Sequence, residues 1–239
     1  MTDEIFSRDA YAASTDAVVT DVSDGGVVLD RTVFYARGGG QPGDTGMLRW
    51  EGGEAHVADT VKSGREVLHV LDAGTSTPTV GTAVTAEIDW ARRHTLMRTH
   101  TALHALSGIV FTDYGAKVTG GNMEPGVARM DFELEGISQE FGREVEAKLN
   151  VALKQDHPVH VSFLPRAEAL ADPDLIRTKV SLIPEHVDPI REIDIEGLDK
   201  QADGGTHVRS TAEVGTVRVV KTESKGRANK RMRIELDEP

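Results

Sequence analysis

The sequence contains no cysteine and no long hydrophobic run. The absence of cysteine from its 239 residues excludes disulfide bonds, thiolate nucleophiles and the cysteine-rich kind of zinc site. No apolar stretch approaches the roughly 20 residues that a membrane-spanning helix needs. Residues 1–14 include Asp3, Glu4 and Asp9 and lack the apolar segment of a secretory signal. We therefore expect a cytoplasmic protein that does not enter a membrane.

The chain is also poor in positive charge. It carries 27 lysines and arginines against 39 aspartates and glutamates, for a formal net charge of -12. Such a field repels phosphates, so any contact with nucleic acid has to come from a local basic patch. The acidic excess is otherwise typical of a solvated surface or of adaptation to salt.

Residues 1–89 show the pattern of a small all-β domain. Hydrophobic residues make up 38% of the chain, enough for the core of one large or two small domains. The turn at residues 23–26 predicts a hairpin. Many short strands at close spacing are typical of a barrel or a sandwich, and we expect a small barrel. Short β-branched runs predict these strands at residues 17–20, 27–35, 47–50, 55–61, 66–71 and 83–88.

The pattern changes at Asp89, so we place a second domain at residues 90–239. Asp89 can cap a helix from Trp90 to about Val110. Ser138 begins a second helix, which ends before Pro158. We expect a turn-rich link at 115–121, a short helical stretch at 166–172, and strands at 127–134, 160–164, 190–195, 213–222 and 231–236. The predicted fold is therefore α+β, an N-terminal small β-barrel followed by helices on an antiparallel sheet.

Three of the nine histidines form a pattern. His100 and His104 lie four residues apart on one face of the first helix, so both rings can reach one ion about 2.0–2.1 Å away. Thr101 follows His100, so this is not the His-Glu-x-x-His helix of metalloproteases. Asp203-Gly204-Gly205-Thr206-His207 places a third histidine in a glycine-rich turn, where Asp203 and His207 can face one point.

The three histidines favour a site for one divalent metal ion, most simply zinc. A His-xxx-His pair by itself is more often two surface histidines, and the spacing leaves that alternative open. The pattern gives no role to His56, His69, His94 and His186.

The glycine-rich stretch at residues 34–46 is the most unusual part of the sequence. No Gly-Lys-Ser or Gly-Lys-Thr follows, which excludes a P-loop, and no helix pattern follows, which excludes a dinucleotide fingerprint. One interpretation is a flexible hairpin. In the other, Gly39 and Gly40 let a ligand approach the backbone closely while Gln41 offers its amide.

Taken together, these segments resemble the alanyl-tRNA editing family, the freestanding AlaX proteins, and the editing domain of alanyl-tRNA synthetase. The resemblance covers essentially the whole chain, and the length is that of the medium-sized class. The matching segments follow the family's order: 34–46, Met97–His104, Ala128–Phe132, Ile195–Asp199 and Gly204–His207.

The resemblance implies an aminoacyl-tRNA deacylase. Its partner would be tRNA for alanine that carries the wrong amino acid, chiefly serine and sometimes glycine, and no obligatory protein partner is evident. A synthetase pocket for alanine cannot exclude the smaller glycine and rejects an added hydroxyl poorly, so a second site has to hydrolyse the errors. Water would attack the ester, and we assign no catalytic base.

The resemblance also implies a zinc site with one zinc ion per chain. The family's ligands are two histidines of His-xxx-His and the cysteine and histidine of Cys-Gly-Gly-Thr-His, and Asp203 stands here at the cysteine position. Aspartate can bind zinc through an oxygen at about 2.0–2.2 Å, although this harder ligand weakens selectivity for zinc. Alternatively, Asp203 orients His207 or a water molecule without touching the metal.

The expected substrate-binding residues are Gly39, Gly40, Gln41, Thr119, Gly205 and Thr206. Thr119 lies where the family has a polar residue near the amino-acid pocket. Its hydroxyl could hydrogen-bond the serine side chain, and the alternative is a simple turn threonine.

A local basic balance near the C-terminus offers a surface for tRNA. After Gly204, eight basic residues stand against five acidic ones, which is typical of a phosphate-binding face or of a solvated strand edge. The expected tRNA contacts are Arg92, Arg93, Lys225, Arg227, Lys230 and Arg231. Two other functions stay open: a metal-dependent esterase acting on a small molecule, and a catalytically silent tRNA-binding module.

Overall fold

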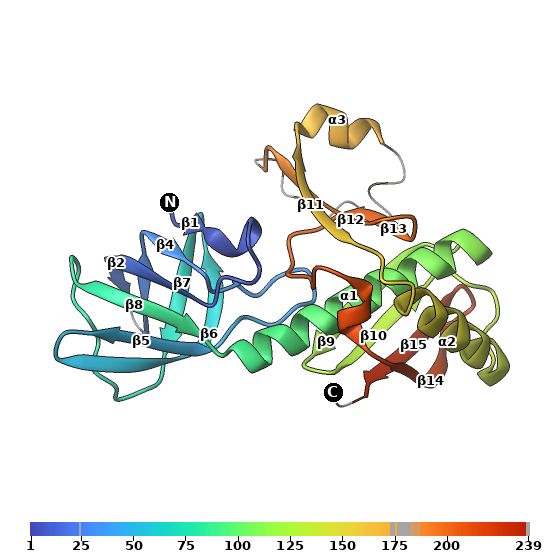
Figure 1. Cartoon of the computed structure of the whole chain (residues 1–239), viewed down its shortest axis with the longest axis horizontal. Coiled ribbons are helices and arrows are strands. Elements are labelled where there is room, and N and C mark those ends of the chain that lie inside the picture. The colour runs from blue at the N-terminus through green and yellow to red at the C-terminus, as the bar shows by residue number, and fades with distance from the viewer. Residues whose placement is uncertain (24, 173–174, 176–182, 184, 186, 238–239) are drawn as a thin grey trace. The chain divides into compact units, whose positions relative to one another are not determined.

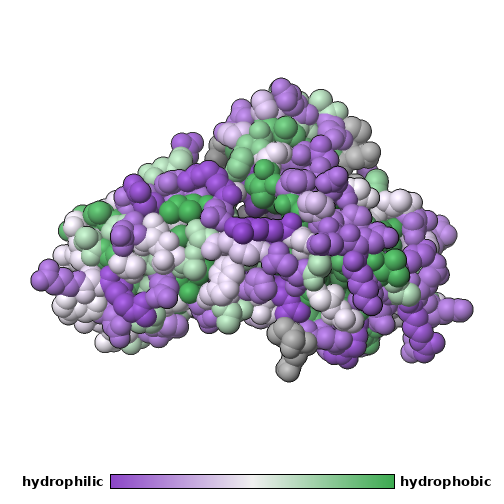
Figure 2. Space-filling model, in the orientation of Figure 1, coloured by the Kyte–Doolittle hydropathy of each residue, from purple (hydrophilic) through white to green (hydrophobic). Residues whose placement is uncertain are grey.

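The computed structural model describes residues 1–23, 25–172, 175, 183, 185 and 187–237. The chain packs as two compact units, Met1–Thr95 and Leu96–Pro239 (Figure 1). The division falls within the helix α1 (Trp90–Tyr114), shortly after the domain boundary predicted at residue 89. Within the described ranges, no helix has both the length and the apolar character needed to cross a membrane. Hydrophilic residues cover most of the visible surface in Figure 2.

Unit 1 is the predicted β-barrel. Its strands close in the order β2-β3-β7-β6-β5-β8, and every neighbouring pair is antiparallel. In β8, Val84, Ala86 and Ile88 are buried while the residues between them are exposed, as expected for a strand with one face in the core. The barrel strands are β2 (Ser14–Ser23), β3 (Gly26–Leu29), β5 (Gly46–Trp50), β6 (Gly53–Ser63), β7 (Glu66–Leu71) and β8 (Ala83–Ile88).

The strand predicted at residues 27–35 was wrong in its second half. β3 ends at Leu29, and only Arg31–Thr32 (β4) forms a further short strand, parallel to β1 (Asp3–Glu4). The 3₁₀ turn η1 (Ile5–Ser7) follows β1. The backbone N–H of Phe34 donates to Thr32 Oγ1 and that of Tyr35 to Asp44 Oδ2. Apolar side chains are buried here without a strand partner, so composition alone mimicked a strand.

Unit 2 combines α1 with two antiparallel sheets. The four-stranded sheet has the order β14-β15-β10-β9, and the three-stranded sheet has the order β11-β12-β13. α2 (Gln139–Leu153) packs on β14, and α3 (Arg166–Ala171) follows β11. The strands are β9 (Val118–Glu124), β10 (Val127–Phe132), β11 (Val159–Leu164), β12 (Ile190–Ile195), β13 (Asp199–Ala202), β14 (Val217–Gly226) and β15 (Asn229–Leu236).

The predicted helix starts are confirmed by their capping hydrogen bonds. Asp89 Oδ1 accepts from the N–H of Arg92 at 3.0 Å, and Ser138 Oγ accepts from the N–H of Phe141 at 3.0 Å. α1 runs past the predicted end at Val110 to Tyr114, whose ring packs against that of Phe141. The predicted α+β class is therefore correct.

Two predictions in unit 2 were wrong in part, and one strand was not predicted. The link expected at 115–121 becomes the strand β9 from Val118, because its backbone pairs with β10 and two glycines do not interrupt the ladder. The strand expected at 213–222 begins as the 3₁₀ turn η2 (Thr211–Val214), and the ladder starts only at Val217. β13 was not predicted, because Asp-Lys-Gln-Ala lacks β-branched residues.

Candidate metal centre

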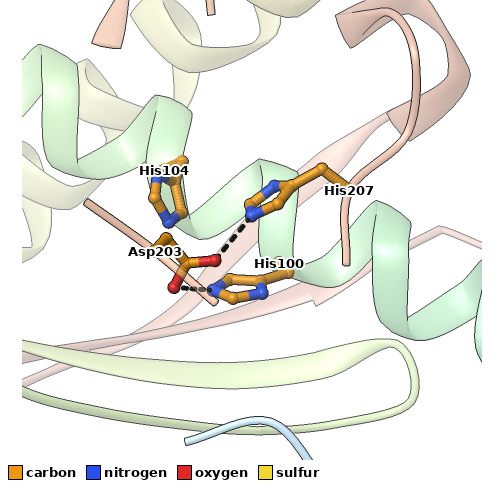
Figure 3. A group of neighbouring side chains, drawn as sticks. All are labelled: His100, His104, Asp203 and His207. Atoms are coloured by element: carbon orange, nitrogen blue, oxygen red, sulfur yellow. Dashed lines mark hydrogen bonds and ion pairs between the residues drawn. The ribbon is translucent and has the colours of Figure 1, made fainter. Parts of the chain in front are cut away.

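Four polar side chains of unit 2 converge on one point. His100 and His104 lie one turn apart on α1, and Asp203 and His207 come from the turn after β13 (Figure 3). One ligand atom from each side chain lies within 4.8 Å of all the others. The imidazole centroids are 4.4 to 5.1 Å apart. The structure thus brings together all four residues that the sequence placed at the metal site.

Three features bring these side chains together: the pairing of β12 with β13, a tight turn at Asp203, and the close packing of Gly108 against Leu198. β13 brings Asp203 to the start of β12, where the N–H of Asp203 donates to the carbonyl of Arg191 at 3.2 Å. Asp203 Oδ2 then accepts from the N–H of Gly205 at 2.6 Å, which closes the turn toward His207. On the helix side only glycine fits at 108, since a Cβ there would lie 2.3 Å from the carbonyl oxygen of Leu198. The helix and the β12–β13 turn can therefore meet.

Two of the three histidines each have one ring nitrogen engaged by the protein. His104 Nδ1 donates to the buried carboxylate of Asp199 at 3.0 Å, and His207 Nδ1 hydrogen-bonds Thr101 Oγ1 at 3.1 Å. Such partners fix the ring orientation and leave Nε2 as the nitrogen for a metal ion. His207 Nε2 lies 3.1 Å from Asp203 Oδ2, and His100 Nε2 lies 3.7 Å from Asp203 Oδ1.

The electrostatics of the centre favour a cation. Burial lowers the pKa of His100 to about 4 and holds the pKa of His207 well below its ordinary value. Burial also opposes the protonation of His104, but the hydrogen bond and charge of Asp199 outweigh it and raise the pKa of that ring. The neighbouring imidazoles outweigh the burial of Asp203 and keep its pKa well below the usual range. An ionised carboxylate thus faces two neutral imidazoles in a buried place.

The donor set suits zinc. Three imidazole nitrogens and one carboxylate oxygen are ordinary zinc ligands, and tetrahedral coordination at 2.0–2.1 Å puts them about 3.3 Å apart. The separations of 3.1 and 3.7 Å between Asp203 and two histidines fall on either side of that value. The same four groups also suit other divalent ions that accept nitrogen and oxygen.

Comparison with known proteins accounts for both parts of the chain. Residues 6–92 match the family described as "tRNA synthetases class II (A)", and residues 190–233 match "Threonyl and Alanyl tRNA synthetase second additional domain". The second match includes Asp203 and His207. The chain is 37% identical to the alanyl-tRNA editing protein AlaX-M of Saccharolobus solfataricus, over 97% of this chain and 98% of that protein. The chain belongs to the AlaX-M family.

Other relatives agree with this membership. The AlaX-M protein of Methanosarcina acetivorans is 34% identical over 97% of this chain and 98% of its own length. The alanine–tRNA ligase of Pyrobaculum arsenaticum is 37% identical over 93% of this chain, and the match takes up 25% of the ligase. The resemblance inferred from the ordered motifs is thus confirmed.

Two residues of this AlaX-M centre were missed by sequence reasoning. Asp199 holds His104, and Arg191, which is 8% exposed, donates from Nη1 to the carbonyl of Asp203 at 2.9 Å. The alternation Asp199, Gln201, Asp203 along one strand face could have revealed the first. Arg191 follows only from the register of β12 against β13.

The glycine-rich loop belongs to unit 1. Gly38 and Gln41 exchange backbone hydrogen bonds of 3.1 and 2.9 Å, and Gly39 and Gly40 take positive φ values of 58° and 86°. This is a tight turn with an exposed tip. Gln41 is 1% exposed, so its side chain is buried within the loop of unit 1.

The remaining predicted substrate residues lie in unit 2. Gly205 and Thr206 are buried in the turn that joins Asp203 to His207. Thr119 is exposed on β9, and its hydroxyl donates to Asn229 Oδ1 at 3.3 Å. It is therefore a strand residue and not a turn threonine.

Two of the expected tRNA contacts, Arg93 and Lys230, are buried in this structure. Arg93 is 0% exposed, because its guanidinium forms a buried ion pair with Asp44 and donates to the carbonyl of Val33. Lys230 is 4% exposed and donates to the carbonyls of Gly226 and Arg227. Both charges are thus engaged by groups within the protein.

The other four basic residues differ in how far their charges are free for tRNA. Arg231 forms two hydrogen bonds with Asp131, of 2.6 and 2.8 Å. Arg92 is half-buried and donates to the carbonyl of Gly43. Lys225 and Arg227 are exposed at the β14–β15 hairpin. The hairpin tip is thus the part of the predicted basic face that keeps its charge at the surface.

Proposed function

We propose that this AlaX-M family member is a trans-editing hydrolase of the cytoplasm that removes serine, and also glycine, from mischarged tRNA for alanine at one zinc ion. The observation that carries the proposal is the buried His100, His104, Asp203 and His207 cluster in a chain related over nearly its full length to alanyl-tRNA editing proteins. The matched synthetase families agree with a tRNA substrate.

In this proposal the three histidines hold the zinc ion, and Asp203 either completes the set or orients His207. When bound, zinc supplies a Lewis acid that polarises an ester carbonyl and lowers the pKa of water to about 7. Asp199 and Thr101 keep the rings of His104 and His207 aimed at one point. If Asp203 does not ligate the ion, its carboxylate would orient His207 or a bound water.

Metal analysis paired with deacylation of seryl-tRNA for alanine tests the proposal. We expect about one zinc per chain and release of serine. His104→Ala should lose both, whereas His56→Ala, a control at a side chain that is 47% exposed, should lose neither. A metal-loaded protein that cleaves small esters but not seryl-tRNA would be the small-molecule esterase. A protein that binds tRNA without metal would be the silent module.

The proposed substrate-binding residues are Thr119, Gly205 and Thr206 in unit 2 and, as a separate group, Gly39, Gly40 and Gln41 in the loop of unit 1. Thr119 is exposed, so its hydroxyl can meet a serine side chain that alanine lacks. Thr119→Val should reduce hydrolysis of seryl-tRNA more than that of glycyl-tRNA. If neither substrate is affected, Thr119 is not in the pocket.

The tRNA backbone is proposed to meet Lys225 and Arg227, with Arg92 and Arg231 as weaker contributors. Reversing both hairpin charges, as Lys225→Glu with Arg227→Glu, should weaken tRNA binding. The slope of the logarithm of the binding constant against the logarithm of salt concentration should become shallower by about two, or about one for each lost phosphate contact. Wild-type affinity that hardly changes with salt would contradict a phosphate-binding face.

A further inference from the structure

The three-stranded sheet β11-β12-β13 connects the position of Asp203 to the outer strand β11. Phe163 on β11 is the register partner of Arg191 on β12, and the N–H of Asp203 donates to the carbonyl of Arg191. Residues directly opposite each other in a sheet point to the same face. Phe163, Arg191 and Asp203 therefore form one row across the sheet, on the face that carries the Asp203 carboxylate.

The next row shows which side of this face is covered. It consists of Val161, Ile193 and Gln201. Gln201 Nε2 donates to Ser107 Oγ on α1 at 3.2 Å, so the β13 side of the face lies on the helix. Ile193 is fully buried, but Val161 and Phe163 are 40% and 43% exposed. These two residues form an exposed apolar strip, which we call the β11 shelf.

Phe163 is unusual among the aromatic residues. The chain has two tryptophans, three tyrosines and six phenylalanines. All of them lie within the described residues, and Phe163 is the one that is exposed. Hydrophobic residues also show on the surface of the region that holds β11 and α3 (Figure 2). An exposed aromatic ring is a surface on which proteins stack unpaired nucleobases.

The spacing suits the end of a charged tRNA. Strands lie 4.7–4.9 Å apart, so two strand steps put Phe163 about 10 Å across the sheet from Asp203. In aminoacyl-tRNA the ester is attached to the ribose of an unpaired terminal adenosine, so the base lies one ribose away from the bond to be cut. A ring at the far end of the row can meet that base while the ester lies at the centre.

We propose that the β11 shelf, with Phe163 as its main contact, stacks the terminal adenine of the aminoacyl-tRNA and so places the ester at the metal centre. This inference rests on the proposed function and adds a nucleobase subsite to it. Stacking recognises the flat face of a base without reading its sequence. Phe163 is thus a substrate-binding residue and takes no part in the chemical step.

The test compares Phe163→Ala and Phe163→Tyr on two substrates, seryl-tRNA for alanine and serine ethyl ester, which has no nucleobase. We expect Phe163→Ala to raise KM for seryl-tRNA about tenfold, the typical effect of losing one stacked base, with kcat unchanged. Phe163→Tyr should keep the wild-type KM, and hydrolysis of the ethyl ester should be the same in all three proteins. Leu170→Ala, at a side chain on α3 that is 50% exposed, is the matched control.

A second measurement separates this inference from the proposed function. A tRNA acceptor-stem RNA with 2-aminopurine in place of its terminal adenine should lose fluorescence on binding the wild type, and should not on binding Phe163→Ala, whether or not hydrolysis occurs. A wild type that does not cleave seryl-tRNA contradicts the proposed function alone. Phe163→Ala equal to Leu170→Ala in KM and in fluorescence overturns the stacking role, as does an equal loss on the ethyl ester.

Discussion

The two units bury polar side chains in opposite ways. In unit 1 the guanidinium of Arg93 and the carboxylate of Asp44 pair with each other at 0% and 1% exposure, and both also bond to backbone groups. In unit 2 the three histidines of the candidate metal centre, 4 to 7% exposed, surround the carboxylate of Asp203, and His104 also contacts that of Asp199. In the first arrangement the positive and negative charges neutralise each other. The second arrangement offers unprotonated nitrogen and carboxylate donors to an added cation.

Two histidines make the contrast sharper. His69 in the barrel has Nε2 hydrogen-bonded to Thr32 Oγ1 at 2.7 Å and Nδ1 3.2 Å from the carbonyl of Val27. Burial lowers its pKa to about 4, the same value as for His100. A lowered pKa therefore does not by itself mark a functional site. The distinguishing feature is the convergence of several such groups on one point.

The largest effect should follow from breaking the buried ion pair between Arg93 and Asp44 in unit 1. Arg93→Met leaves the Asp44 carboxylate buried without its partner, and we expect a loss of about 3–5 kcal/mol in the free energy of unfolding. Urea unfolding followed by tryptophan fluorescence measures this, because Trp50 and Trp90 both belong to unit 1. Adding Asp44→Leu should restore much of the loss. A change in the free energy of unfolding below about 1 kcal/mol would show that Asp44 does not depend on Arg93 for its buried charge.

Removing metal should act on the other unit. A ligand present at 100 to 1,000 times its Kd stabilises the folded state by about 2.7–4.1 kcal/mol. A chelator should thus lower hydrogen-exchange protection in β12, β13 and the part of α1 that carries His100 and His104. Protection of the barrel strands β6 and β7 is the internal control. Equal loss in both units would contradict the difference that we draw between them.

Acid should weaken the barrel through His69. The unfolded chain takes up a proton near pH 6.5, whereas folded His69 resists protonation until about pH 4. The unfolded state binds more protons in that window, so stability is full above pH 6.5 and falls by about 3 kcal/mol as the pH drops toward 4. His69→Gln should flatten the pH dependence of urea unfolding. His56→Gln, the exposed control, should leave it as steep as in the wild type.

The smallest effect should come from the residue that holds His104. Asp199→Asn replaces a charged acceptor by a neutral one of similar shape. Changes of this kind weaken metal binding by about 10- to 100-fold, which competition with a coloured chelator can measure. Asp194→Asn on the neighbouring strand β12 is the control. An unchanged metal affinity would mean that the hydrogen bond from His104 does not orient the ring.

Local patterns were enough to predict much of the fold. The caps at Asp89 and Ser138 and the short strands of the barrel depend on neighbours in sequence. The four candidate ligands were also found, because His100 and His104 share a helix face and Asp203 and His207 share a glycine-rich turn. The ordered family motifs then joined the two segments.

Features that depend on distant partners were not predictable. Arg93 looks like a surface charge until Asp44, 49 residues earlier, is seen beside it. Likewise, the strand β13 and the contact from Arg191 to Asp203 exist only through the register of β12. Phe163 gives no pattern of its own, and its place beside the centre follows from the same register.

The carboxylate at position 203 has a consequence for chemical durability. A thiolate ligand can be oxidised to sulfenic and then irreversibly to sulfinic and sulfonic acids, each step removing it as a ligand. The three imidazoles and one carboxylate of this centre contain no sulfur. Exposure to peroxide should therefore leave these four side chains chemically intact, whereas a cysteine at position 203 would be oxidised and lost as a ligand.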